Sequence, residues 1–241
     1  MRRCLTPATR HLPEFRAMLT NHHASPVSTL VLSLLHLALL AMLASPGLTA
    51  AGSGGARASP RVESRVDWSA IVEANVNRPP DDLEGRLYLA IAYANQGMIK
   101  EAAREFRTIE SAGYEEFGRE VIARAEQALD RDPDDIVSLN LVGFAYYAFS
   151  DFERSAECLE KLVALDPRNI WTRHYFAVSL SKIGEIDRAI EVLRAALSLD
   201  PSNEYTHLLL GLAYKEKGWY ILSVLELARA GRAVRELSTL K

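Results

Sequence analysis

The chain has 241 residues, of which 24% are charged and 49% are hydrophobic, and its formal net charge is −3. These proportions are those of an ordinary soluble protein, apart from one apolar stretch near the N-terminus. Residues 52–241 carry 24 basic and 30 acidic side chains, a net charge of −6, and no run of Lys and Arg with interleaved aromatics. This balance excludes a general nucleic-acid binder, which would show a basic face.

Residues 1–51 have the pattern of an export signal or a membrane anchor. Residues 27–44 form an 18-residue apolar run without a charge, preceded by four arginines and followed by small residues. The pattern predicts cleavage near residues 48–51 and export, so that the protein would be periplasmic or extracellular. The alternative is an uncleaved anchor in the cytoplasmic membrane with the rest of the chain outside, because the run is long enough to span a bilayer. Met18 is a second candidate start, which would remove the four arginines.

Residues 52–82 are predicted to form a flexible linker and a short capping helix. Ala, Gly, Ser and Pro dominate the segment up to residue 62, a composition that buries little surface. Trp68, Ile71 and Val72 then indicate a short helix between residues 66 and 76. We expect this helix to cover the first of the units that follow.

Beyond residue 82 the sequence repeats with a period of 34 residues. Asp-Pro dipeptides place Pro133, Pro167 and Pro201 at intervals of 34 and 34. Such a period is typical of stacked helix–turn–helix units. In each unit, small residues let the two helices approach and bulky residues fill the space between them. A proline ends the second helix. The recurring positions are Gly143/Ala177/Gly211, Tyr146/Leu180/Tyr214, Ser150/Gly184/Gly218, Ser155/Ala189/Ser223, Leu159/Leu193/Leu227 and Leu162/Ala196/Ala230.

These positions resemble the pattern of the tetratricopeptide repeat (TPR) family. The resemblance covers about residues 83–237 and implies an all-α fold, a right-handed superhelical stack of helix–turn–helix units (an α-solenoid), in a TPR domain of residues 83–241. Arg235 stands where the last unit would have its proline, so we expect the second helix of that unit to continue toward the chain end. The units are expected at about 83–116, 136–169, 170–203 and 204–237.

The period is broken once. Pro80 and Pro133 are 53 residues apart, 19 more than one period, and residues from about 114 to 130 carry apolar side chains at helical spacing. We interpret this segment as an extra helix packed on the stack between the first and second units. The alternative is an insertion specific to one partner.

No set of residues indicates catalysis or a cofactor. His174 and His207 are the only histidines after residue 36, and no Cys or His cluster adds the further ligands that a metal site needs. Cys4 and Cys158 are the only cysteines, and Cys158 is expected to be a small buried hydrophobe. No phosphate-binding glycine loop or nucleophile turn occurs. We therefore expect a non-enzymatic protein without a catalytic, cofactor or metal site.

In TPR proteins the first helix of each unit lines a concave groove, and the resemblance implies a peptide- or partner-binding face here. Its apolar and aromatic side chains suit an extended or helical peptide with apolar anchors. The alternative is that some of these side chains pack against neighbouring units. The predicted groove residues are Leu87, Ile91, Asn140, Phe144, Tyr147, Trp171, His174, Val178, Tyr205, Leu208, Leu212 and Lys215.

The sequence thus predicts an exported scaffold that binds a peptide or partner protein in its groove. The alternative function is a structural subunit of an envelope or secretion complex that assembles through convex or end-helix surfaces, near Trp219, Tyr220 and Leu222. The oligomeric state and the partner's identity stay open at this point.

Overall fold

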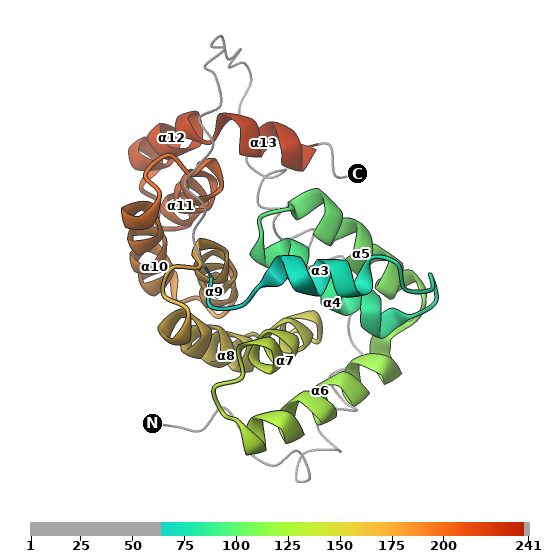
Figure 1. The fold of residues 1–241 in the computed structure, drawn as a ribbon. Helices are drawn as coiled ribbons and strands as arrows, with labels where there is room; N and C mark the ends of the chain where they lie inside the picture. The colour runs from blue at the N-terminus through green and yellow to red at the C-terminus, as the bar shows by residue number, and fades with distance from the viewer. Residues whose placement is uncertain (1–63, 239–241) are drawn as a thin grey trace.

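The computed structural model describes residues 64–238, and all the regular structure in that range is helical (Figure 1). The predicted export signal and nearly all of the linker, residues 1–63, lie outside the described residues. The helices are α3 (Trp68–Asn75), α4 (Leu83–Asn95), α5 (Ile99–Ser111), α6 (Tyr114–Arg131), α7 (Ile136–Ala148), α8 (Phe152–Leu165), α9 (Ile170–Lys182), α10 (Ile186–Leu199), α11 (Glu204–Glu216), α12 (Tyr220–Arg229) and α13 (Gly231–Ser238).

Four helix pairs make up the fold: α4 with α5, α7 with α8, α9 with α10, and α11 with α12. The second helix of a pair also packs on the first helix of the next, α8 on α9 and α10 on α11, so that α7 to α12 form a curved stack (Figure 1). The predicted all-α repeat architecture, an α-solenoid, is confirmed.

One residue in the left-handed conformation separates the two helices of every pair. Gly97, Gly184 and Gly218 have φ angles of 74°, 82° and 76°, and Ser150 has 61°. In each case the next N–H donates back to a carbonyl of the preceding helix, as Glu185 does to Leu180 at 2.9 Å. This is a Schellman ending, for which glycine is the favoured residue. The turn position predicted from the repeat therefore has a definite backbone role.

An Asp or Asn side chain begins the first helix of each pair. Asp82, Asp135, Asn169 and Asn203 each accept a hydrogen bond from an N–H of the first turn. Such caps satisfy donors that have no partner within the helix. Before Asp135, Asn169 and Asn203, an Asp-Pro dipeptide ends the preceding helix only a few residues earlier, so the sequence fixes both ends of these three connections.

The extra helix predicted between the first and second units is α6. It packs mainly on α7, as α8 packs on α9, and only lightly on α5. The Tyr146 hydroxyl on α7 donates to Glu126 on α6. In the stack, α6 therefore stands where the second helix of a preceding unit would stand. This agrees with the prediction of an extra helix that packs on the stack.

The last unit departs from the expected continuous second helix. α12 ends at Arg229, and α13 begins at Gly231 and packs on α11. Ala230 and Ala233 are completely buried, and the Ala233 N–H donates to Glu204 at 3.0 Å. The expectation of an uninterrupted helix was wrong, because a break at Ala230 lets the last segment bury its small side chains against α11.

Replacing Ser150 with Gly is expected to stabilise the protein by about 1 kcal/mol, because Ser150 occupies a left-handed conformation that disfavours a side chain. Urea unfolding of the parent and the variant measures the difference. The reciprocal control is Gly184→Ser, at the same position of the next unit, where a Cβ meets nothing within 4 Å. It should lose a similar amount, and a Ser150→Gly protein no more stable than the parent would contradict the assignment.

Candidate functional site

The predicted groove residues belong to α4, α7, α9 and α11, and the end of α4 packs against α7 and α9. In Figure 1, α3, α4 and α5 lie within the curve of α7 to α13. The Tyr175 hydroxyl on α9 donates to the Ala94 carbonyl at 3.1 Å. The Trp171 ring lies so close to Gly97 that a Cβ there would come within 2.1 Å of it. The first unit thus touches the third directly.

Three buried asparagines join α4 to α7 and α9. Asn95 donates to Asn140 Oδ1 at 3.0 Å and accepts from Asn169 Nδ2 at 2.8 Å. None of the three is more than 5% exposed. Buried amides are costly unless they are hydrogen-bonded, and here each amide supplies a partner for another. The set therefore fixes the position of α4 relative to both α7 and α9.

Aromatic packing follows the same path across the concave side. The Phe106 ring on α5 stacks on Phe144 of α7 with centroids 5.8 Å apart, and Phe144 meets the edge of Tyr175 on α9 at 4.8 Å. Such ring pairs add to the stabilisation that burial alone provides. The first helix pair is thus part of the continuous hydrophobic core.

The segment before α3 is fastened to the same stack. The Ser64 hydroxyl donates to the Asp166 carboxylate, and Arg65 donates to the Leu165 carbonyl at 3.1 Å. Trp68, buried at the start of α3, donates to Ser64 Oγ at 3.1 Å. The first unit is therefore held at two places, through the end of α4 and through the chain that precedes α3.

Most of the predicted groove side chains are covered by the protein itself. Four of them, Leu87, Trp171, Tyr205 and Lys215, keep part of their surface exposed. The other eight are buried within the protein. Those eight are Ile91, Asn140, Phe144, Tyr147, His174, Val178, Leu208 and Leu212.

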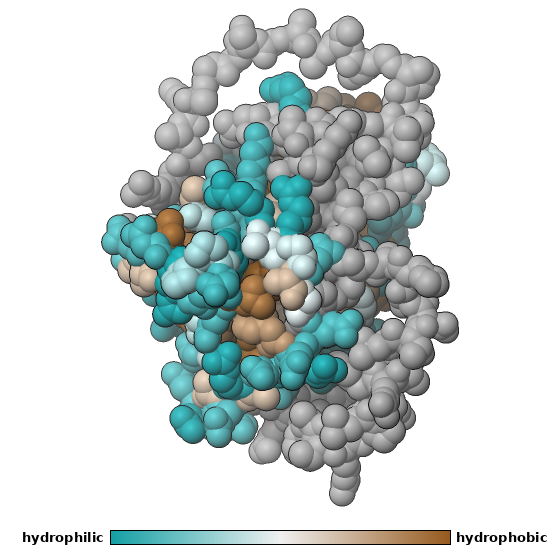
Figure 2. All heavy atoms as spheres, turned by 90° about the vertical axis from the view of Figure 1, so that its right-hand side faces the viewer, coloured by the Kyte–Doolittle hydropathy of each residue, from teal (hydrophilic) through white to brown (hydrophobic). Residues whose placement is uncertain are grey.

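The accessible part of the concave side is centred on two aromatic rings. Trp171 on α9 and Tyr205 on α11 meet edge to face with centroids 5.3 Å apart, and Trp171 also meets His174 at 5.0 Å. Figure 2 shows a different side of the molecule, the right-hand side of Figure 1 where α4 and α5 lie, and there a small group of apolar side chains is surrounded by polar ones. Sequence reasoning found these rings, but it missed Asn169, whose cap position gave no sign of a contact with the first unit.

His174 is a buried neutral imidazole. Burial lowers its pKa to about 3. Its Nε2 lies 2.7 Å from Thr206 Oγ1, whose own proton is directed at Asn203 Oδ1. Nε2 therefore carries the ring proton and donates it, which leaves Nδ1 as a buried acceptor without a hydrogen-bond partner. This arrangement serves packing between α9 and α11 and provides no ready proton donor for catalysis.

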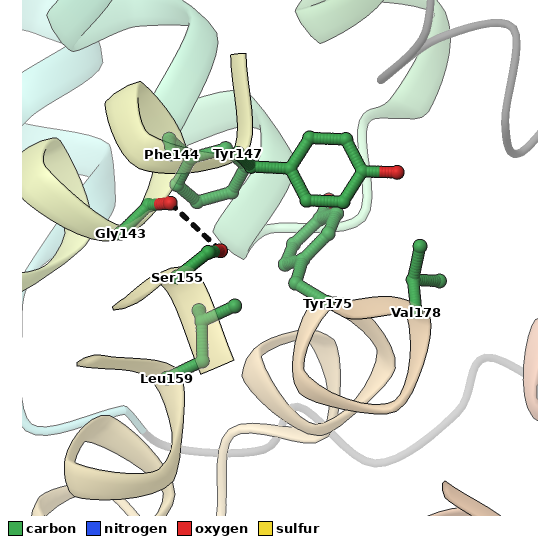
Figure 3. Close-up of a pocket in the computed structure, with 7 residues that line it drawn as sticks. All are labelled: Gly143, Phe144, Tyr147, Ser155, Leu159, Tyr175 and Val178. Carbon is green, nitrogen blue, oxygen red and sulfur yellow. Dashed lines mark hydrogen bonds between the residues drawn. The ribbon is translucent and has the colours of Figure 1, made fainter. Parts of the chain in front are cut away.

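A small apolar pocket lies between α7, α8 and α9 (Figure 3). Phe144, Tyr147 and Tyr175 form part of its wall, and the Ser155 hydroxyl donates across one side to the Gly143 carbonyl at 2.9 Å. The cavity volume of about 10 Å³ is at the lower limit for a single water. We interpret it as a packing void and not as a ligand site.

Two further observations concern the described residues 64–238. No three His, Cys, Asp or Glu side chains in this range are grouped so that they could hold a metal ion. Within the same range, none of the helices combines the length and the apolar character needed to cross a bilayer.

Comparison with known proteins agrees with the geometry. Residues 179–218 match the family model described as "TPR repeat". This match covers the end of α9, all of α10 and α11, and the turn at Gly218. The chain contains a tetratricopeptide repeat at these residues. TPR repeats point to a protein–protein interaction scaffold and to a non-enzymatic function.

Solved structures of MamA share a broad likeness with this TPR protein. "MamA MSR-1 C2" is 23% identical with a TM-score of 0.43, covering 71% of this chain and 89% of that chain. "MamA AMB-1 P212121" is 21% identical with a TM-score of 0.44, covering 68% and 81%. The structure described as "Crystal structure of MamA" is 18% identical with a TM-score of 0.45, covering 71% and 86%. The search of curated proteins found no match. The family assignment rests on the repeat match and the four helix pairs.

The buried His174 predicts a specific pH dependence of stability. Its pKa is lowered in the folded state, so between pH 6.5 and about 3 the unfolded chain binds a proton that the folded chain does not. Stability should therefore fall as the pH decreases through this window, by up to about 1.4 kcal/mol per pH unit from this group. His174→Gln should remove that part of the slope in urea unfolding measured from pH 7 to pH 4. Equal slopes for parent and variant would contradict the assignment.

Proposed function

We propose that this TPR protein is an exported scaffold that holds a partner protein against the concave side of α9 and α11. The observation that carries the proposal is the pair of partly exposed rings, Trp171 and Tyr205, beside the closed part of the concave side. Aromatic side chains at a partly desolvated site are frequent hot spots of binding. Lys215, at the far end of α11, adds a charged group to the accessible surface.

The closed middle of the concave side limits the kind of partner. Because α4 packs on α7 and α9 through buried amides, a peptide running along all four first helices would have to displace the first unit. A short segment or a surface loop that docks on α9 and α11 needs no such change. The proposed ligand is therefore a short stretch of a protein with an apolar or aromatic anchor.

Export is proposed from the sequence. The apolar run of residues 27–44, the preceding arginines and the small residues around position 50 support a signal that is cleaved near residues 48–51. The repeats would then act in the periplasm or outside the cell. With an uncleaved anchor they would act at the outer side of the cytoplasmic membrane.

This function can be tested with a photo-reactive amino acid in place of Tyr205. The full chain carrying it is made and irradiated in the cells that naturally produce the protein. A single partner protein should become cross-linked from this position, and mass spectrometry of the adduct would also give the N-terminus of the mature chain. The matched control carries the same amino acid at Glu191, an exposed position on α10. Equal adducts from both positions, or none from position 205, would contradict binding at the concave side, and an N-terminus at residue 1 or 18 would contradict cleavage.

The second candidate is a structural subunit that assembles through an end helix. It is favoured by the exposed apolar surface of α12, which the concave-side proposal does not use.

A further inference from the structure

The start of α12 carries the most conspicuous apolar surface of the described residues. Trp219, Tyr220, Ile221, Leu222, Val224 and Leu225, here called the α12 patch, are between 40% and 81% exposed. They follow one another over two helical turns, and an open hollow lies against Gly218–Leu222. Monomeric soluble proteins rarely leave so many adjacent large apolar side chains in water.

The repeat itself shows that this surface is not a general feature of the fold. One period earlier, Ile221 and Leu225 correspond to Asp187 and Glu191, both exposed on α10. Two periods earlier, they correspond to Glu153 and Glu157, both exposed on α8. The outer face of the second helix is thus charged in two units and apolar in the last.

A second part of the patch corresponds to positions that the stack normally buries. Val224 is equivalent to Ile190 and Ala156, which are 3% and 5% exposed, whereas Val224 is 62% exposed. α12 is therefore apolar on its outer face and also on the face that earlier units cover. Residues 220–225 contain one small polar side chain, Ser223, and a helical segment that is apolar on most of its surface is normally buried.

The charge distribution is that of a protein interface. Residues 218–225 contain no charged side chain, and Lys217 and Glu226 stand at the two ends of this stretch. A charge-depleted centre with Trp and Tyr and a polar rim is the composition of interface cores.

We propose that the α12 patch is the contact surface of a symmetric homodimer, in which α12 of a second copy of this chain packs antiparallel on α12. The exposed parts of six large side chains amount to roughly 600 Å² per copy, and two copies together reach the lower range of stable interfaces. A twofold axis near Ile221 and Leu222 makes the patch self-complementary. Lys217 and Glu226, which pair with Asp187 and with His207 and Arg229 within one chain, would lie at the two ends of this contact. The dimer does not depend on the concave-side proposal.

A single-cysteine cross-link tests the contact. Ile221→Cys in the full chain, with Cys4→Ser, should form a disulfide-linked dimer under mild oxidation, because the same residue of the two copies meets near the axis. The buried Cys158 stays in place. The matched control is Asp187→Cys, at the same position of the preceding unit, which should stay monomeric on a non-reducing gel. Cross-linking that is equal at both positions, or absent at position 221, would overturn the proposal.

A charge substitution tests the same surface without a new bond. Ile221→Asp with Leu225→Glu introduces the residue types that α10 carries at these positions, and both sites are exposed, so helix content measured by circular dichroism should not change. In sedimentation equilibrium the variant should dimerise at least about tenfold more weakly than the parent. A folded variant that dimerises like the parent, or a parent that is monomeric at micromolar concentration, would overturn the proposal. A monomeric parent that floats with anionic liposomes, when the variant does not, would assign the patch to a lipid surface instead.

Discussion

The hydrogen bonds among the buried amides of Asn95, Asn140 and Asn169 set the arrangement on which the rest of this structure depends. In most repeat arrays each unit contacts only its neighbours, and stability is a sum over adjacent pairs. Here the amides tie the first unit to the second and to the third at once. Because a buried amide that loses its partner is costly, the three side chains oppose separation of these units.

The added helix α6 makes this arrangement possible. It packs on α7 where a second helix of a preceding unit would lie, so the pair α4–α5 does not have to fill that place. The pair instead lies within the curve of the stack, with the end of α4 against α9 and Phe106 of α5 against Phe144. The additional 19 residues between prolines thus change the concave surface of the stack, because the first unit turns inward and leaves the region of Trp171 and Tyr205 partly exposed there.

The sequence predicted the local structure well for a physical reason. Turn residues, capping side chains and small packing residues act within one unit or between neighbours, and all of them recur at the period of 34, so Gly184 and Gly218 could be assigned a role from spacing alone. The contact between α4 and α9 could not be predicted in this way. It depends on the orientation that α6 gives to the first unit, and periodicity carries no information about orientation. Eight predicted groove residues are core residues in the structure, because the repeat assigns a residue to a helical face but does not show what covers that face. The break between α12 and α13 at Ala230 was not predicted. A single residue position decides whether the helix continues there, and the repeat pattern does not show it.

The most direct test of this account is a double-mutant cycle on Asn95 and Asn169, measured by urea unfolding of Asn95→Ala, Asn169→Ala and the double variant. The cycle removes the separate contribution of Asn169 as the cap of α9 and leaves the energy of the contact between the first and third units. The account predicts a coupling of about 1 kcal/mol or more between the two sites. Effects that add to within about 0.3 kcal/mol would show that the two side chains are independent, and would contradict a first unit docked on the concave side.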